Sequence, residues 1–180
     1  AFDCSPFNLL LNREAVKLGS PYDQDGAWAR VGNLNQTLLE QLNALPFYAV
    51  SGAKSLGRES IDQVFIPILD QPGLSPKDCL RTLVEHFALQ IAALIRSHSS
   101  KASPSVLLTG GGAYNRYFME RLDHHLSQQW IQVEATKELV EFKEALIFAF
   151  LGVLKLRGEA NALASVTGAI RDSSGGAIYG

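Results

Sequence analysis

The stretch Val106-Leu107-Leu108-Thr109-Gly110-Gly111-Gly112-Ala113-Tyr114-Asn115 decides the fold. Its apolar start predicts a buried strand over 105–109, and the residues after the glycines predict a helix over 114–126. Three glycines between a strand and a helix let the backbone approach a ligand closely and leave amide groups open at the helix start. The spacing matches neither a P-loop nor the dinucleotide-binding G-x-G-x-x-G. From the residues alone, a nucleotide contact and a plain strand-to-helix turn are equal alternatives.

Helices and strands alternate along the rest of the chain. The clearest helix begins at Ser75-Pro76, where Ser75 is a good N-cap and Pro76 suits the first helical position. Apolar residues then recur at helical spacing for about four turns. They are Leu80, Leu83, Val84, Phe87, Ala88, Ile91, Leu94 and Ile95. This alternation predicts an α/β fold, although the strands are few for so many helices.

Other segments give weaker signals. Apolar spacing predicts helices over 9–18 and 34–45, and period-two alternation predicts a short strand over 130–133. A helix over 141–157 is apolar on nearly all sides, so we expect it to be buried. In the tail we expect loops at 165–168 and 173–176 and a strand at 177–179.

Composition excludes several classes of protein. The 180 residues carry 16 Lys and Arg against 18 Asp and Glu, so no positive field would attract nucleic acid. The longest apolar stretch, 145–154, is about half of the ~20 residues that a membrane helix needs. Two cysteines, Cys4 and Cys79, are too few for a disulfide framework and favour a reducing cytosol. The only methionine is Met119, so we expect either processing before Ala1 or a longer parent protein.

Three further segments carry polar side chains. Asp3 and Asn8 flank a Pro turn that suits a phosphate or a metal-bound water, although local capping is the commoner role for such an Asp. The cations of 54–59 could meet an anion or lie on the surface. Glu144 begins the apolar helix, where it must be paired, solvated or bound, and a place near the helix N-terminus is favourable in itself. The four histidines fit no zinc spacing and no catalytic triad.

Short motifs follow one another along nearly the whole chain. They are Phe2-Asp3…Pro6…Asn8, Tyr22-Asp23…Asp25-Gly26, Lys54-Ser55…Gly57-Arg58-Glu59, Gly110-Gly111-Gly112-Ala113…Asn115, Lys143-Glu144-Ala145, Ser165-Val166-Thr167-Gly168-Ala169 and Gly175-Gly176…Ile178-Tyr179. Each motif alone is weak, but the order and spacing of all seven resemble the C-terminal half of the anhydro-N-acetylmuramic acid kinase family.

The resemblance implies a fold and an activity. The family belongs to the superfamily of sugar kinases, actin and heat-shock ATPases, in which two ribonuclease-H-like lobes close over a nucleotide. Residues 1–180 would then be the helix-rich C-terminal lobe of a two-lobed, cytoplasmic sugar kinase, without its N-terminal lobe. The reaction uses ATP and Mg²⁺ to phosphorylate 1,6-anhydro-N-acetylmuramic acid while water opens the anhydro ring. The product is N-acetylmuramic acid 6-phosphate, an intermediate of peptidoglycan recycling. Family members often form homodimers.

The resemblance also implies roles for particular residues. Those expected to bind ATP are Gly110, Gly111, Gly112 and Asn115 on the adenosine side, with Asp3 and Asn8 near the phosphates. Glu144 matches a family glutamate and would bind the sugar. Lys54 and Arg58 match a family loop with no assigned roles. No metal ligand is assigned, and the catalytic Asp base is expected in the N-terminal half, before Ala1.

One segment departs from the family pattern. Where most members carry Thr-Gly-Pro-Gly, this chain has Cys4-Ser5-Pro6-Phe7, so easy backbone approach to phosphate is lost and Phe7 adds bulk. Two hypotheses follow. The chain is one lobe of an active kinase, or it is a diverged, non-catalytic module that binds a nucleotide or a sugar.

Overall fold

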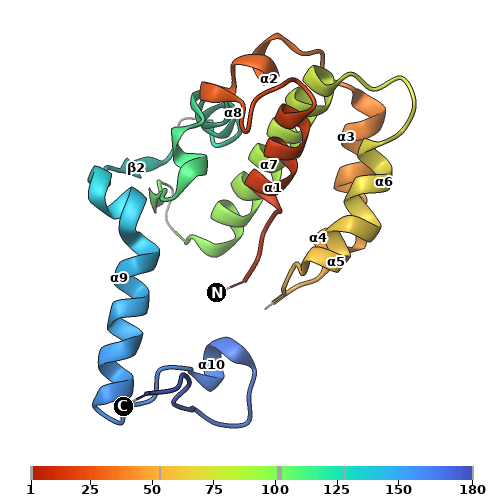
Figure 1. Ribbon diagram of the computed structural model, residues 1–180. Coiled ribbons are helices and arrows are strands. Elements are labelled where there is room, and N and C mark those ends of the chain that lie inside the picture. Colours follow the sequence, from red (N-terminus) through yellow and green to blue (C-terminus); the bar gives the residue numbers. More distant parts are fainter. Residues whose placement is uncertain (1, 53, 101–102, 128, 180) are drawn as a thin grey trace. The chain divides into compact units, whose positions relative to one another are not determined.

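The computed structural model describes residues 2–52, 54–100, 103–127 and 129–179. Its contacts divide the described chain into a unit of residues 2–134 and a unit of residues 135–179 (Figure 1).

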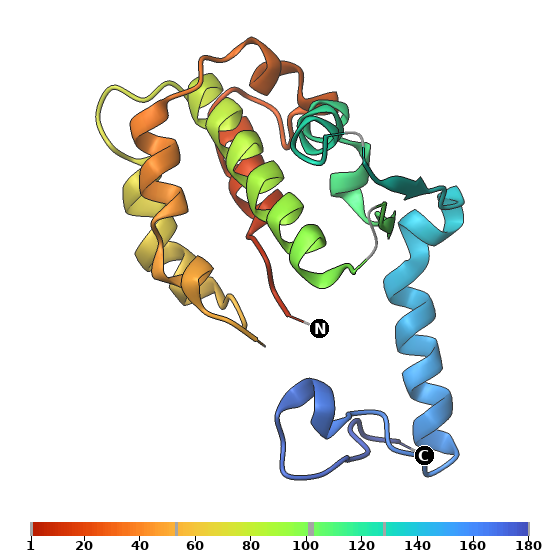
Figure 2. The ribbon, with the colours of Figure 1, turned by 180° about the vertical axis from the view of Figure 1, so that it is seen from behind.

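Helix α7 (Pro76–His98) is the centre of the first unit. It begins as predicted, because the Ser75 hydroxyl accepts a hydrogen bond from the Asp78 amide at 3.1 Å and Pro76 occupies the first turn. The first half of the predicted apolar face, from Leu80 to Ala88, is fully buried. Four helices pack on it, as Figures 1 and 2 show. These are α1 (Phe7–Val16), α2 (Ala27–Val31), α3 (Gln36–Asn43) and α8 (Arg116–His125).

Shorter helical segments complete this unit. They are η1 (Gln24–Gly26), α4 (Pro46–Ala49), α5 (Arg58–Ser60), the π-helical turn η2 (Ile61–Phe65), α6 (Ile66–Leu69) and the 3-10 turn η3 (Gly111–Tyr114). The predicted helices over 9–18 and 34–45 correspond to α1 and α3 and are confirmed, with ends that shift by about one helical turn or less.

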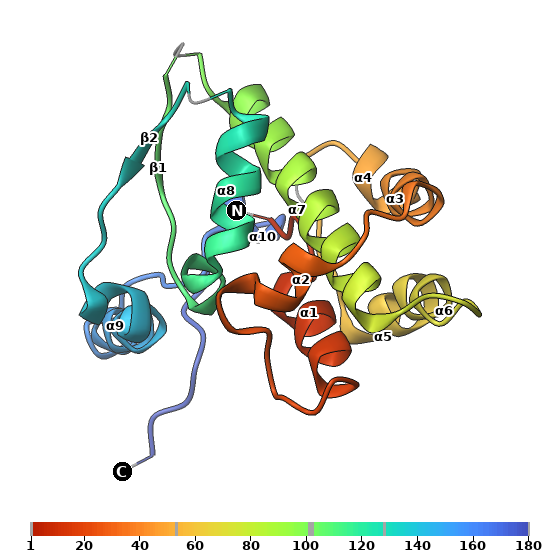
Figure 3. The same cartoon turned by 90° about the horizontal axis from the view of Figure 1, so that it is seen from above.

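The two predicted strands form a small parallel sheet. Strand β1 (Ser105–Leu107) pairs with β2 (Ile131–Val133), and helix α8 forms the connection between them. Figure 3 shows α8 between the sheet and α7. The α/β class is therefore confirmed as a helix-rich unit with a small sheet. The expectation of a buried strand is wrong, because the described residues leave Leu107 about half exposed, at 47%.

The second unit contains α9 (Lys137–Leu156) and α10 (Ala164–Thr167). Helix α9 starts one turn earlier than predicted, where the Thr136 hydroxyl accepts from the Leu139 amide at 3.3 Å. The helix α10 replaces the loop expected at 165–168, and residues 177–179 form no strand among the described residues. No described residue of α9 is buried, so the expected burial is wrong. An apolar pattern shows which side chains would be stabilised by burial. It does not show whether these 180 residues provide the surface that buries them.

None of the described helices combines the length and the apolar character required to cross a membrane.

A buried carboxylate joins α7 to α8. Glu85, which is 5% exposed, accepts hydrogen bonds from Arg121 at 2.8 and 2.9 Å, from Arg81 at 2.7 Å and from His125 at 2.7 Å. Burial raises the pKa of Glu85, but the bonds from Arg121, Arg81 and His125 outweigh it and lower the pKa to about 2. Glu85 is therefore ionised in the folded protein at every ordinary pH.

This network predicts a specific loss of stability in acid. The folded pKa lies below the ordinary value of 4.5, so the stabilisation is complete above that value and is lost as the pH falls toward 2. We expect Glu85→Gln to lower the free energy of unfolding by about 3 kcal/mol at pH 7, because it leaves two arginines without their carboxylate. Between pH 5 and 2.5 the variant should lose less stability than the unmodified chain.

Urea unfolding across this pH range measures both effects. Glu120→Gln is the control, because it removes only an exposed ion pair with Arg30 and should change little. Parallel acid profiles for Glu85→Gln and the unmodified chain would contradict the assignment.

Candidate functional site

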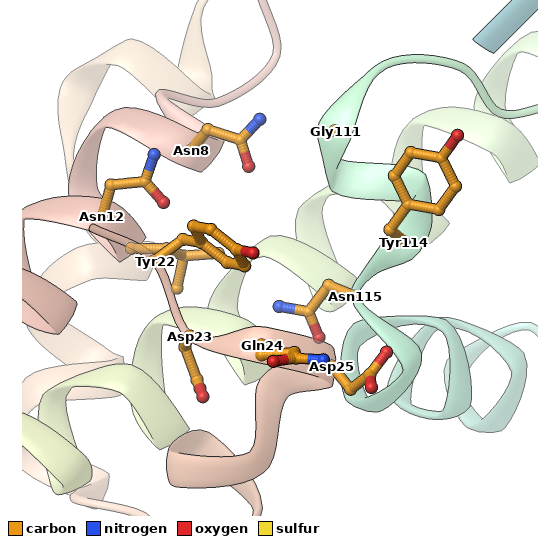
Figure 4. Close-up of a pocket in the computed structure, with 10 residues that line it drawn as sticks. Asn8, Asn12, Tyr22, Asp23, Gln24, Asp25, Gly111, Tyr114 and Asn115 are labelled. Atoms are coloured by element: carbon orange, nitrogen blue, oxygen red, sulfur yellow. The ribbon is translucent and has the colours of Figure 1, made fainter. Parts of the chain in front are cut away.

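The first unit contains a cavity of about 470 Å³ between α1, the loop that leads into η1, and η3 (Figure 4). The residues that line it are Asn8, Leu11, Asn12, Tyr22, Asp23, Gln24, Asp25, Gly111, Tyr114 and Asn115. Amide and tyrosine side chains dominate this wall. Such a wall suits a flat, polar ligand, because tyrosine rings offer faces for stacking and amides offer both donors and acceptors.

The glycine run forms the turn that was predicted. Gly110 follows the sheet and has a φ of +81°, a left-handed conformation that glycine adopts without strain. Gly111 lines the cavity, and an added Cβ there would lie 3.5 Å from the Asn8 amide nitrogen. The structure therefore brings together Asn8, Gly111 and Asn115, three of the residues expected to bind ATP.

Asn115 is held in one orientation. Its Oδ1 accepts a hydrogen bond from the Phe118 amide at 2.9 Å and so caps α8. Because the helix end needs an acceptor, the oxygen is committed to it, and the Nδ2 group faces the cavity (Figure 4). Asn115 thus presents a hydrogen-bond donor, fixed by the start of α8, to anything bound there.

Sequence reasoning missed the loop of residues 22–26 as part of the site. Both oxygens of Asp23 accept from the first turn of α2, from Trp28 at 2.8 Å and from Ala29 at 2.9 Å. The Asp25 carboxylate lies 3.4 Å from the Arg116 guanidinium. The motif Tyr22-Asp23…Asp25-Gly26 covers this loop, but in the sequence analysis it supported only the family resemblance. Asn12 and Tyr114 gave no signal of their own.

Asp3 lies away from this cavity. Its Oδ2 accepts from the Leu56 amide at 2.8 Å and from the Ser55 hydroxyl at 3.3 Å, and its own amide donates to the Lys54 carbonyl at 3.0 Å. Its other oxygen has no hydrogen bond to any described residue. Asp3 therefore ties the chain's first segment to the loop that begins at Lys54.

The Lys54 ammonium is already engaged. It donates to the carbonyls of Phe47 at 2.9 Å and Val50 at 3.2 Å, and it lies 4.4 Å from the centre of the Phe47 ring. Arg58 pairs with Asp62 on the exposed face of α5 and η2 at 3.0 Å. In this structure the two cations stabilise local elements.

A chain of hydrogen bonds runs from His86 on α7 through Tyr48 to Ser5 in the chain's first segment. His86 contacts Asn43 through Nδ1 and the Tyr48 hydroxyl through Nε2, both at 2.7 Å, and the Tyr48 oxygen lies 3.5 Å from Ser5 Oγ. Burial lowers the pKa of His86 to about 3 and raises that of Tyr48. Both groups are therefore neutral, and they act as hydrogen-bond partners.

Glu144 lies on α9 in the second unit, with an exposed side chain. The described residues contain no group of three or more His, Cys, Asp or Glu side chains placed to hold a metal ion.

Comparison with known proteins decides the family. The family model described as anhydro-N-acetylmuramic acid kinase matches residues 1–180. The chain belongs to the anhydro-N-acetylmuramic acid kinase family. A relative of that name from Saccharophagus degradans is 34% identical over 184 residues, which cover 99% of this chain and 49% of the relative. One from Variovorax paradoxus is 36% identical over 182 residues, which cover 99% and 48%. The chain spans about half the length of these curated relatives.

Gly26 provides a test of how the loop of residues 22–26 meets Asn115. It has a φ of +71°, and an added Cβ would collide with the Asn115 side-chain oxygen and lie 2.6 Å from the Tyr117 Cβ. We expect Gly26→Ala to cost about 3 kcal/mol of unfolding free energy, from left-handed strain and overpacking together. Gly19→Ala is the matched control, because Gly19 has a φ of +88° with nothing within 4 Å. It should cost only about 1 kcal/mol. Equal losses in urea unfolding would show that the contact with Asn115 does not matter.

Proposed function

We propose that the cavity beside η3 binds the adenosine part of ATP in an anhydro-N-acetylmuramic acid kinase. The observation that carries the proposal is that Asn8, Gly111 and Asn115 line one cavity in a chain of this family. The glycine turn that follows β1 and the start of α8 form part of its wall, an arrangement that suits a nucleotide. Within this proposal, residues 1–180 form the ribonuclease-H-like C-terminal lobe of a two-lobed cytoplasmic enzyme.

The proposed reaction is phosphorylation of 1,6-anhydro-N-acetylmuramic acid by ATP with hydrolytic opening of the anhydro ring. Water attacks the anomeric carbon as a base removes its proton, and the 6-oxygen released from the ring takes the γ-phosphoryl group. The products are N-acetylmuramic acid 6-phosphate and ADP, as peptidoglycan recycling requires. Glu144 is proposed to bind the sugar, through hydrogen bonds from sugar hydroxyls to its carboxylate.

Within the proposal, ATP is bound together with a Mg²⁺ ion. Mg²⁺ keeps several waters and needs only one or two carboxylates besides the phosphates, so a cluster of three acidic side chains is not required. Asp3 has one carboxylate oxygen without a hydrogen bond to the described residues and would hold the ion, directly or through water. The bound ion would neutralise charge on the transferred phosphoryl group.

Turnover of the anhydro sugar by a family-length protein that contains these 180 residues tests the proposal. We expect ADP and N-acetylmuramic acid 6-phosphate to form in equal amounts when ATP and Mg²⁺ are present. Binding of nucleotide or sugar without any turnover would instead support the diverged, non-catalytic module that the Cys4-Ser5-Pro6-Phe7 segment suggests.

Asn115 offers a test of nucleotide binding that leaves the fold intact. Asn115→Asp keeps an oxygen to cap α8 but replaces the donor that faces the cavity with an acceptor. We expect the KM for ATP to rise about tenfold or more while stability is retained, because an acceptor now meets the acceptors of the ligand. Asn115→Ala should also weaken ATP binding and, in addition, cost about 1 kcal/mol of stability through the lost cap. An unchanged KM in Asn115→Asp would remove Asn115 from the site.

Asp3 can be tested in the same assay. Asp3→Asn keeps an acceptor for the Leu56 amide but removes the negative charge. We expect kcat to fall about tenfold, because charge near the phosphates and Mg²⁺ is lost. Ser55→Ala is the control, because it removes a hydrogen bond from the same carboxylate and leaves its charge. Unchanged kinetics would place Asp3 outside the reaction.

A further inference from the structure

We propose that Phe7 is a positioning residue that sets the distance between α1 and the glycine turn η3. In this proposal Gly112 lacks a side chain because Phe7 lies against it, and not because a ligand does. The inference rests on the proposed function, since it assigns the spacing of the cavity walls to a contact outside the cavity.

The contact between Phe7 and Gly112 leaves no room for a side chain. A Cβ built on Gly112 would lie 2.9 Å from Phe7 Cε1 and 3.1 Å from Phe7 Cδ1. Carbon atoms that are not bonded to each other pack at about 3.5–4.0 Å. Either the ring or the turn would therefore have to move if residue 112 were larger than glycine.

The Phe7 ring has little freedom to move. Its centre lies 4.6 Å from the Phe118 ring in an edge-to-face arrangement and 5.2 Å from the Phe87 ring. Phe87 is fully buried on α7, and Phe118 is 3% exposed on α8. Helices α7 and α8 thus hold the ring in place. An added side chain at position 112 would therefore push the turn away from α1.

The other two glycines differ from Gly112. Gly110 has open space around it and a left-handed φ, while Gly111 lines the cavity and would make only an ordinary 3.5 Å contact with Asn8. Gly112 does not line the cavity. A ligand in the cavity therefore gives no reason for a glycine at 112, whereas the Phe7 ring does.

Phe7 and Asn8, neighbours in the first turn of α1, face different surroundings. Adjacent helical residues point about 100° apart, so one can face the core while the other faces the cavity. Asn8 lines the cavity, and Phe7 packs against Phe87, Phe118 and Gly112. The bulky residue that departs from the family pattern thus fixes the cavity wall and does not obstruct the cavity itself.

The test is a double-mutant cycle between positions 7 and 112. Gly112→Ala, Phe7→Leu and the double variant are compared in thermal unfolding of the 180-residue chain without nucleotide. The KM and kcat for ATP are then measured in the family-length protein. Gly111→Ala, alone and with Phe7→Leu, is the control, because Gly111 lines the cavity but does not touch Phe7.

We expect Gly112→Ala to lower the unfolding midpoint by about 5 °C and to raise the KM for ATP about tenfold, with kcat within about twofold. In the double variant, Phe7→Leu should raise the unfolding midpoint again and return the KM for ATP to within about threefold of the unmodified protein. The smaller side chain makes room for the added methyl group. The defect of Gly111→Ala should not be restored. Phe7→Leu alone should raise the KM about threefold, since a looser ring no longer fixes the turn.

Two outcomes would overturn the proposal. In one, Phe7→Leu leaves the Gly112→Ala defect unchanged, so that the methyl group meets something other than the ring. In the other, it restores Gly111→Ala equally well, so that the effect is not specific. If Gly112→Ala does not fold, the KM of Phe7→Leu alone decides, and an unchanged KM counts against the proposal. Failure of the unmodified protein to turn over ATP would refute the proposed function, while the coupling in thermal unfolding would still test the contact.

Discussion

The burial of one face of α7 is the constraint on which the first unit depends. Helices α1, α2 and α3 precede α7 in the sequence and α8 follows it, and each packs on α7. Burial of apolar side chains provides the main driving force, and the Glu85 network adds a fixed connection between α7 and α8. Because α1 and α8 are both held on α7, the first turn of α1 and the glycine turn that leads into α8 lie against each other.

The cavity is a consequence of this arrangement. Its walls belong to α1, to the loop before α2 and to the turn before α8, three segments whose positions are fixed by helices packed on α7. Local capping then aims the polar groups. The Asp23 carboxylate caps α2 and Asn115 Oδ1 caps α8, so of these capping groups the Asn115 side-chain nitrogen remains to face the cavity. Capping of the helix ends therefore determines which polar atoms of Asp23 and Asn115 face the cavity.

The sequence predicted the features that depend on neighbouring residues. The N-cap at Ser75, the apolar face of α7 and the strand–turn–helix around the glycines are such features, and all three are present. Features that depend on distant partners were missed or wrong. Whether α9 is buried could not be inferred from its apolar pattern, and the loop of residues 22–26 lines the cavity because the fold brings it beside α1 and η3. Asp3 and Asn8 lie in one motif, yet the structure directs Asp3 to the Lys54 loop and Asn8 to the cavity.

The run Gly110-Gly111-Gly112 shows why a motif alone does not reveal its own cause. The first glycine adopts a left-handed conformation, the second forms part of the cavity wall beside Asn8, and the third leaves room for the Phe7 ring. In a sequence these three requirements look identical, because each is met by the absence of a side chain. They differ in what an added methyl group would meet: a strained left-handed backbone at the first position, the Asn8 side chain at the second, and the Phe7 ring, held by α7 and α8, at the third.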